Sequence, residues 1–245
     1  MADGHAYVLV HSPVAGPSTW APVAGELDRR GIAVAVPEVT DDGSPPFWRQ
    51  HVRCVVRTIA EDVPPGVPLS LAAHSGAGQL LGVLGPVLRD AGYDIAAEIL
   101  ADAGTPPDGR SRLDQIDEQA PEVGEHIRAA LTDGGGYPMW RDGDLKDPIP
   151  DDDRRRRLSG ELRALPAAFW LEEIPTAVDW PDAPVGVLVF SDACTWVADV
   201  AGARAWTTRT IGVDNHFLPM VDEARVADAL IALTGDLMDA GHASP

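Results

Sequence analysis

Ser75 lies at the junction between an apolar run and a helix-like run, within the small-residue segment 73–77 (AHSGA). A serine flanked by small residues at such a junction is typical of a nucleophile elbow, a tight strand-to-helix turn that exposes the serine hydroxyl. Small residues are needed there because the strand and the helix pass close to each other. We therefore expect Ser75 to be a nucleophile, with an ordinary glycine-rich loop as the alternative.

A serine nucleophile needs a base within hydrogen-bond reach and an acid that orients the base. His216 follows the last predicted strand and precedes the last predicted helix, which is the placement expected of the base. Asp192 follows directly on an apolar run and is the expected acid. Asp102 also ends a predicted strand and is the alternative acid.

The elements that must position these residues alternate between apolar runs and amphipathic segments. Continuous apolar runs suit strands that are buried on both faces. The alternation predicts an α/β fold with a doubly wound, mostly parallel sheet and helices on both faces. Residues that follow parallel strands meet at the carboxyl edge of the sheet, so the three groups can come together there. The expected strands cover residues 6–10, 32–36, 69–74, 95–101, 185–190 and 207–213, and the expected helices 21–31, 48–61, 79–91, 199–206 and 221–238.

Residues 105–183 interrupt this rhythm. They contain helix-like pieces over 113–131 and 158–165, separated by glycines, prolines and an acidic triplet followed by four arginines. The acidic residues before the arginines indicate the start of a helix. We expect an α/β core formed by residues 1–104 and 184–245, with 105–183 as a helical lid over the carboxyl ends of the strands.

Composition excludes several classes of partner. The formal net charge is −19 over 245 residues, which disfavours binding to nucleic acid and to anionic membranes. No apolar run reaches the ~18 residues of a membrane span, and the polar N-terminus does not resemble a signal peptide. The two cysteines, Cys54 and Cys194, form no metal-binding or disulfide pattern. We expect a cytoplasmic protein without cofactor or metal, acting on a small molecule.

The chain resembles the α/β-hydrolase fold superfamily over nearly its full length. Within it, the chain is most similar to small esterases related to plant methyl-ester esterases and hydroxynitrile lyases. The resemblance is carried by 7–11 with Trp20, by 73–77, by 101–106 and by 214–219. It implies Ser75 as nucleophile, His216 as base, and an acid after the strand at 185–190, in the chain order serine, acid, histidine.

The first loop departs from this family. The family usually has His-Gly after the first strand, where this chain has His11-Ser12-Pro13. An oxyanion hole needs N–H groups aimed at the developing negative charge, and Gly76 is expected to supply one of them. Pro13 has no N–H. We expect the second donor to come from Ser12, through its amide or hydroxyl, or from Val14.

Aromatic residues and histidines are expected around the substrate. His11 and His74 flank the predicted site, and Trp20, Trp140 and Trp170 are candidates to line an apolar pocket. Packing within the core or the lid is the alternative for each tryptophan.

The predicted function is hydrolysis of a carboxylic ester, lactone or thioester of a small molecule through an acyl-enzyme on Ser75. Two alternatives remain open. The first is a lyase or cyclase in a small-molecule pathway, with Ser75 and His216 as acid and base, which the Pro13 departure favours. The second is a catalytically silent binding protein that has kept the elbow.

Overall fold

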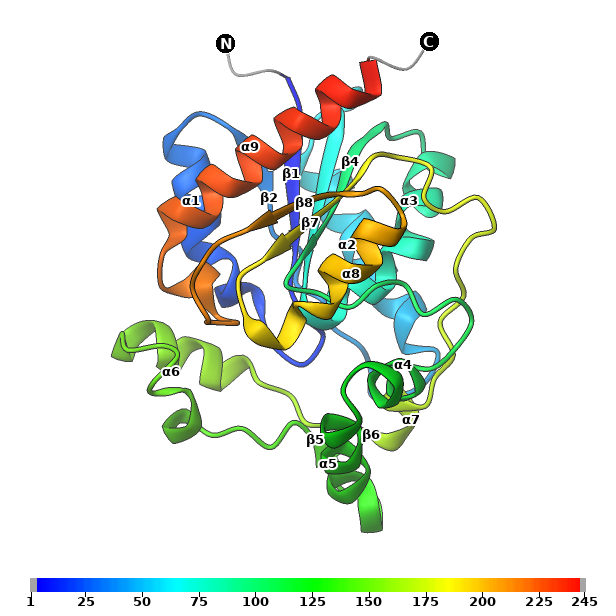
Figure 1. The fold of residues 1–245 in the computed structure, drawn as a ribbon, viewed down its shortest axis with the longest axis vertical. Helices are drawn as coiled ribbons and strands as arrows, with labels where there is room; N and C mark the ends of the chain where they lie inside the picture. The colour runs from blue at the N-terminus through cyan, green and yellow to red at the C-terminus, as the bar shows by residue number, and fades with distance from the viewer. Residues whose placement is uncertain (1–3, 243–245) are drawn as a thin grey trace.

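A six-stranded parallel sheet forms the centre of the molecule (Figure 1). The computed structural model describes residues 4–242 of the chain. The strand order is β2-β1-β3-β4-β7-β8, and every neighbouring pair is parallel. The strands are β1 (Ala6–Val10), β2 (Ala33–Ala35), β3 (Leu69–His74), β4 (Ile95–Ala101), β7 (Val185–Val189) and β8 (Thr207–Thr210). The predicted parallel α/β architecture is therefore confirmed.

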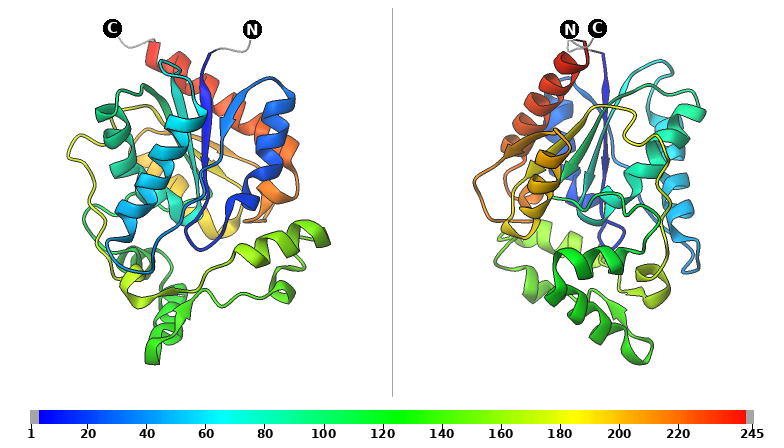
Figure 2. Two further views of the ribbon diagram at one scale, coloured as in Figure 1. Left: turned by 180° about the vertical axis from the view of Figure 1, so that it is seen from behind. Right: turned by 45° about the vertical axis from the view of Figure 1, so that its right-hand side comes forward.

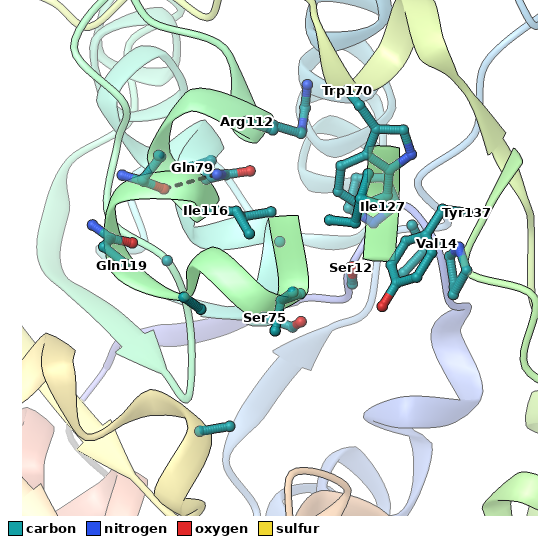
Figure 3. A pocket seen from close by; sticks show the side chains of 18 of the residues that line it. Ser12, Val14, Ser75, Gln79, Arg112, Ile116, Gln119, Ile127, Tyr137 and Trp170 are labelled. Atoms are coloured by element: carbon teal, nitrogen blue, oxygen red, sulfur yellow. Dashed lines mark hydrogen bonds between the residues drawn. The ribbon is translucent and has the colours of Figure 1, made fainter. Parts of the chain in front are cut away.

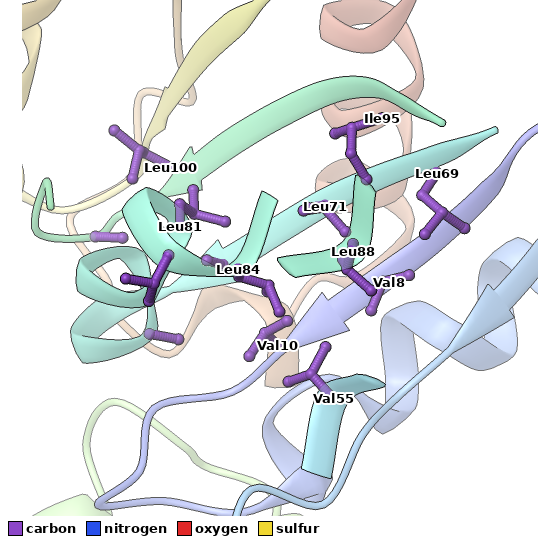
Figure 4. Close-up of a cluster of buried hydrophobic side chains, with 14 of the residues drawn as sticks. Val8, Val10, Val55, Leu69, Leu71, Leu81, Leu84, Leu88, Ile95 and Leu100 are labelled. Atoms are coloured by element: carbon purple, nitrogen blue, oxygen red, sulfur yellow. The ribbon is translucent and has the colours of Figure 1, made fainter. Parts of the chain in front are cut away.

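Helices cover both faces of the sheet (Figure 2). In β1, alternate residues enter different cores, because successive side chains of a strand point to opposite faces. Val8 and Val10 pack in the core beneath α2, α3 and α8 (Figure 4), whereas Tyr7 and Leu9 pack beneath α1 and α9. Within residues 4–242, none of the helices combines the length and apolar character needed to cross a bilayer. The helices are α1 (Ala21–Arg29), α2 (Phe47–Asp62), α3 (Leu81–Asp90), α8 (Trp196–Ala203) and α9 (Glu223–His242).

The order of the strands reverses beside β1. The chain passes from β1 to β2 on one side and then to β3 on the other, so the loops after β1 and β3 leave a crevice between them. Ligands of open α/β sheets bind at this kind of switch point, outside the carboxyl ends of the strands. Ser12 follows β1 and Ser75 follows β3, so the fold itself brings these two residues together.

Residues 112–170, between β4 and β7, lie across the carboxyl ends of the strands and are drawn in green below the sheet in Figure 1, and the chain then returns beside the sheet to the start of β7. The predicted helix over 113–131 is two helices, since Pro121 cannot continue the helix before it. A helix does begin after Asp151, whose carboxylate caps it, but it ends at Glu161, so only residues 158–161 of the predicted helix over 158–165 are helical. The elements are α4 (Arg112–Gln119), α5 (Pro121–Leu131), β5 (Gly136–Tyr137), α6 (Asp152–Glu161), β6 (Leu165–Pro166) and α7 (Ala167–Trp170).

Ion pairs join this segment to the rest of the fold. Arg154 in α6 makes hydrogen bonds of 2.8 and 2.9 Å to the two carboxylate oxygens of Glu223 in α9. Arg163 makes two hydrogen bonds of 2.8 Å to Asp41, whose side chain is buried. Movement of the segment away from the sheet would have to break both bidentate pairs, and these are stronger than single-contact pairs.

Glu98 is a carboxylic acid buried within β4. Its side chain is inaccessible to solvent, and its one hydrogen bond within residues 4–242 comes from Trp180 Nε1 at 2.7 Å. Burial raises the pKa of Glu98 to about 7 from 4.5, and the hydrogen bond from Trp180 only partly opposes this. The folded state therefore binds this proton more tightly than the unfolded chain does.

We expect Glu98 to make stability fall with rising pH. Its contribution is fully present below pH 4.5 and is lost as the pH rises through about 7. The rise of the Glu98 pKa from 4.5 to about 7 corresponds to a loss of unfolding free energy on the order of 3 kcal/mol. Urea unfolding at pH 5 and pH 8 checks this, since Glu98→Gln removes the titration and keeps an acceptor for Trp180. Between pH 5 and pH 8 the unfolding free energy of wild type should fall relative to that of Glu98→Gln, and equal pH dependence of both proteins would contradict the expectation.

Candidate active site

Ser75 stands at the apex of a sharp turn between β3 and a 3-10 helix over Ser75–Leu80. Its φ angle is 56°, in the left-handed region that residues with a Cβ seldom adopt. Gly78 allows the close approach that this turn requires, because a Cβ there would lie 2.1 Å from the carbonyl oxygen of Gly104. The segment thus has the geometry of a nucleophile elbow, and Gly78, which the small-residue pattern did not single out, is its tightest position.

His216 is paired with Asp102, with 2.7 Å between His216 Nδ1 and Asp102 Oδ2. Asp102 is buried, and its Oδ1 accepts the backbone N–H groups of Phe190 and Ser191 at 2.9 and 3.0 Å. Its Oδ2 also accepts the Ser191 hydroxyl. Burial alone would raise the pKa of Asp102, but the hydrogen bonds from His216, Ser191 and Phe190 outweigh it and hold this pKa below its usual range. The carboxylate therefore holds the Nδ1 proton of His216 and leaves Nε2 available as a base.

Asp192 does not lie beside the histidine, so the expectation that it is the orienting acid is corrected in favour of Asp102. Asp192 is exposed at the start of a short turn, and its backbone N–H donates to Asp214 Oδ1 at 2.9 Å. The difference lies in burial and in hydrogen bonding. The Asp102 carboxylate is buried and accepts from the His216 ring and from the backbone just after β7, whereas Asp192 is exposed and makes no hydrogen bond to His216 within residues 4–242.

His74, the residue before Ser75, holds the loop that carries His216. The two rings have centroids 4.6 Å apart, and His74 Nε2 donates to the backbone oxygen of His216 at 3.0 Å. Burial, followed by the neighbouring charge of His216, lowers the pKa of His74 to about 3, so its ring is neutral. Within residues 4–242 no hydrogen bond joins Ser75 to the His216 ring. Such bonds often tighten only when substrate is bound.

Three residues that we expected around the substrate are packed in the protein interior instead. His11, Trp20 and His74 are each at most 2% exposed, and none of them lines the cavity beside Ser75. His11 donates from Nδ1 to the carbonyl oxygen of Ser12 at 2.8 Å and accepts the Val39 N–H at 3.0 Å, and burial lowers its pKa to about 4. Trp20 donates to a backbone oxygen of β1 at 3.1 Å. Their polar atoms are used to fix the loops, which explains why they do not face a ligand.

A cavity of about 250 Å³ opens beside Ser75 (Figure 3). Trp140 and Trp170 lie in its wall, where they were expected. Most of the wall comes from the segment between β4 and β7, which carries no recognisable motif, so its lining residues could not be named from the sequence. The residues of the wall that the sequence analysis did not name include, from this segment, Arg112, Gln115, Ile116, Gln119, Ile127, Tyr137 and Phe169, and, from outside it, Gln79 and Cys194.

Arg112 places a buried cation in this wall. Its guanidinium carbon lies 4.0 Å from the centroid of the Phe169 ring, and Nη1 donates to the Phe169 carbonyl oxygen at 3.3 Å. Nη1 also lies 3.8 Å from a carboxylate oxygen of Glu172. Burial lowers the pKa of Arg112 to about 10, so the group remains charged at neutral pH. Phe169 and Glu172 thus hold Arg112 in place and fix the shape of this part of the cavity.

Ser12 and Pro13 lie next to Gly76. A Cβ on Gly76 would be 3.1 Å from Ser12 Oγ and 3.9 Å from Pro13 Cδ, so the hydroxyl and the proline ring border the elbow. Val14 also lines the cavity, and its carbonyl oxygen accepts the Arg163 N–H at 3.0 Å. The Gly76 amide and the Ser12 hydroxyl are therefore neighbouring donors at one end of the cavity.

One group of side chains among residues 4–242 has the spacing of a metal site: Asp102, Cys194 and His216 offer ligand atoms within 4.8 Å of one another. The chemistry of these donors does not suit a metal. Both Asp102 oxygens already accept hydrogen bonds. Burial raises the pKa of the Cys194 thiol, and its S–H donates to the Asp102 carbonyl oxygen at 3.3 Å. We assign the three residues to the hydrogen-bond network around His216.

Searches against models of protein families and against curated protein sequences found no match. Solved structures do match. One match is an extracellular α/β-hydrolase from a Paenibacillus species, which is described as sharing structural and functional homology with tobacco salicylic acid binding protein 2. It is 16% identical with a TM-score of 0.74, and the match covers 94% of this chain and 98% of that chain. Tomato methylketone synthase I, as an H243A variant in complex with β-ketoheptanoate, is 11% identical with a TM-score of 0.74, covering 96% and 99%.

Polyneuridine aldehyde esterase is 13% identical with a TM-score of 0.71, covering 95% of this chain and 100% of that chain. At these identities the similarity establishes architecture and not chemistry. The agreement extends over nearly the whole of each chain, including the segment between β4 and β7. The parallel sheet, its strand order and these matches together show that the chain has the α/β-hydrolase fold.

Proposed function

We propose that the protein is a serine hydrolase that cleaves a carboxylic ester, lactone or thioester of a small molecule. The observation that carries this proposal is the His216–Asp102 pair at 2.7 Å, placed beside an elbow that presents Ser75 to a cavity. A neutral imidazole oriented by a buried carboxylate is the arrangement that activates a serine hydroxyl.

In the proposed reaction, His216 Nε2 takes the proton of Ser75 while Ser75 Oγ attacks the carbonyl carbon of the substrate. The tetrahedral intermediate then collapses, His216 returns the proton to the departing alcohol or thiol, and an acyl-enzyme remains on Ser75. Water enters, gives a proton to His216 and attacks the acyl carbon, and the carboxylic acid leaves as Ser75 regains its proton. Asp102 stabilises the imidazolium in both halves of the reaction.

The negative charge on the substrate oxygen needs donors on one side of the carbonyl. We assign this role to the Gly76 amide and the Ser12 hydroxyl. Ser12 Oγ lies next to Gly76, and Pro13 has no N–H that could serve instead. Because Pro13 has no N–H, the second donor must be a group other than the backbone amide at position 13.

The names of two of the structural neighbours are consistent with hydrolysis. Polyneuridine aldehyde esterase and a pyrethroid hydrolase from Sphingobium faniae are among the matched structures. Their substrates are not carried over to this chain, since identity to them is 13% and 14%.

Non-hydrolytic chemistry on the same residues is the second candidate. Pro13 removes an amide from the loop that borders Gly76, which weakens the case for a tetrahedral oxyanion. Methylketone synthase, named as a synthase and not as an esterase, is also among the neighbours. In this second candidate reaction, Ser75 and His216 exchange protons with the substrate, and no acyl-enzyme forms.

Turnover of simple acyl donors tests the proposal. We expect hydrolysis of at least one of p-nitrophenyl butyrate, γ-butyrolactone and acetylthiocholine. Ser75→Ala should lower kcat by at least about 10⁴-fold because it removes the nucleophile. Circular dichroism should show the same fold for both proteins. A correctly folded wild type that hydrolyses none of the three favours the second candidate, and a Ser75→Ala variant that retains the activity contradicts the role of Ser75.

A further inference from the structure

Two glutamine side chains in the cavity wall form a hydrogen-bonded relay with a fixed direction. Gln115 Nε2 lies 2.8 Å from the backbone oxygen of Thr105 and 3.1 Å from its hydroxyl oxygen. Gln79 Nε2 lies 2.8 Å from Gln115 Oε1. Gln79 and Gln115 are 4% and 2% exposed, so neither is free to exchange these partners for bulk water.

The backbone oxygen of Thr105 determines which way both amides face. A carbonyl oxygen only accepts, so Gln115 must turn its NH₂ group towards Thr105 and its Oε1 towards Gln79. Gln79 must then turn its own NH₂ group towards Gln115. The opposite orientation of either amide would set two acceptors or two donors against each other. The amide orientation is therefore specified by the network.

The side-chain oxygen of Gln79 is not used by the hydrogen bonds that join the two amides to Thr105. It makes no hydrogen bond to any residue within 4–242, and Gln79 lines the cavity. Figure 3 shows the Gln79 amide held by its hydrogen bond on one side, with its oxygen directed towards the interior of the cavity. The cavity thus contains an acceptor on its wall that is fixed in orientation and cannot become a donor.

The surroundings make this acceptor selective. Ile116 and Ile127 line the same cavity and have no hydrogen-bonding side-chain groups, and the indole N–H of Trp170 is used by a backbone oxygen. Arg112 also lines the cavity, but its Nε and Nη2 make no hydrogen bond within residues 4–242, to Gln79 or to any other residue. A substrate can displace water from the Gln79 oxygen without donating a hydrogen bond to it. The oxygen is then left unpaired, and the free energy lost in this way exceeds the net free energy that a typical intramolecular hydrogen bond gains. Sites of this kind reject analogues that lack the donor.

The position of Gln79 in the chain indicates how far its side-chain oxygen lies from the carbonyl group that Ser75 would attack. Ser75 and Gln79 belong to the same 3-10 helix, four residues apart. The rise of such a helix separates their Cα atoms by roughly 8 Å along its axis. A donor that meets Gln79 is therefore several bonds away from a carbonyl carbon that is attacked by Ser75.

We propose that Gln79 is a specificity residue, which selects small-molecule substrates carrying a hydroxyl or N–H donor several bonds from the scissile carbonyl. Gln115 is a positioning residue that keeps the oxygen of Gln79 towards the substrate. The inference rests on the proposed function for turnover, but the preference for a donor can be measured by binding alone.

The test compares methyl 3-(3-hydroxyphenyl)propanoate and methyl 3-(4-hydroxyphenyl)propanoate with their methoxy counterparts. The two members of each pair have nearly the same shape, but only the phenol donates. We expect kcat/KM of wild type to favour at least one phenol by about 10- to 100-fold. Gln79→Leu should remove this preference by slowing the phenol and not the methoxy ester. Gln115→Met should reduce it, because the Gln79 amide is then free to turn its NH₂ group towards the cavity.

Equilibrium binding to Ser75→Ala separates this inference from the proposed function. The same four esters are titrated calorimetrically into Ser75→Ala and into Ser75→Ala/Gln79→Leu, with thermal melting to show that both fold. Tighter binding of a phenol to Ser75→Ala, lost in the double variant, supports the inference even if wild type hydrolyses nothing. Equal binding of phenols and methoxy esters to Ser75→Ala, including no detectable binding of either, overturns it, as does a preference that survives Gln79→Leu.

Discussion

Asp102→Asn is expected to lower kcat by about 10³- to 10⁴-fold while leaving the fold intact. Asparagine has the shape of aspartate, and one oxygen can still accept the Phe190 and Ser191 N–H groups. The other position becomes an NH₂ group facing His216 Nδ1, 2.7 Å away in wild type. This donor favours the tautomer with the proton on Nε2, which can no longer take a proton from Ser75. Steady-state kinetics on the best substrate of wild type measures the loss.

Asp192→Asn is the matched control. Asp192 is exposed and contacts Asp214 only through its backbone N–H, so removal of its charge should change kcat by less than about twofold. The opposite ranking, with a large loss for Asp192→Asn and a small one for Asp102→Asn, would indicate that Asp192, after β7, orients His216 instead. Comparable small losses for both would show that His216 needs no orienting carboxylate.

Ser12→Ala is expected to lower kcat by about 10²- to 10³-fold, with a much smaller change in KM. The hydroxyl of Ser12 lies next to Gly76, and Pro13 has no amide hydrogen to replace it. A donor that acts mainly on the charge developing in the transition state affects kcat more than KM. The measurement is the separate determination of kcat and KM for wild type and Ser12→Ala.

Two further variants distinguish the hydroxyl of Ser12 from its backbone. Ser12→Thr keeps the hydroxyl and should retain most of the rate. Ser12→Ala/Pro13→Ala places an amide at position 13 and should recover part of the rate lost in Ser12→Ala. Full activity in Ser12→Ala would show that backbone amides alone stabilise the oxyanion, and the second donor would then be the amide of Ser12 or Val14.

The fold could be predicted because its signals are local. Each buried strand is a short apolar run, and each connection contains an amphipathic segment, so the alternation is visible in residues that are close in the sequence. The elbow could also be predicted, because its constraint acts on neighbouring positions. The structure adds Gly78, whose Cβ would meet Gly104 across the fold, a contact that no local pattern shows.

The acid could not be chosen from the sequence because the choice depends on contacts between residues far apart in the chain. Asp102 and Asp192 both follow apolar runs, and only the folded structure shows that the Asp102 carboxylate is buried between His216 and the backbone N–H groups of Phe190 and Ser191. The roles of His11 and Trp20 were misjudged for a related reason. Their position in the loop after the first strand does not reveal that their ring nitrogens are used by backbone groups of the core.

The cavity wall was the least predictable part. Trp140 and Trp170 stood out by residue type, whereas Gln79 and Gln115 are ordinary polar residues of helical segments. Their importance comes from a hydrogen bond between residues 36 positions apart and from the backbone oxygen of Thr105 that orients it. Only the folded arrangement shows that one amide oxygen remains for a ligand.

Labelling with a fluorophosphonate, followed by intact mass and peptide mapping, tests the central claim that Ser75, His216 and Asp102 act as one unit. The probe phosphonylates a serine only when a neighbouring base activates it. The account predicts one label on Ser75 in wild type and Asp192→Asn, none in Ser75→Ala, and labelling slowed by orders of magnitude in His216→Ala and Asp102→Asn. A folded wild type that stays unlabelled, a label on another serine, or labelling of Asp102→Asn at the wild-type rate would contradict it.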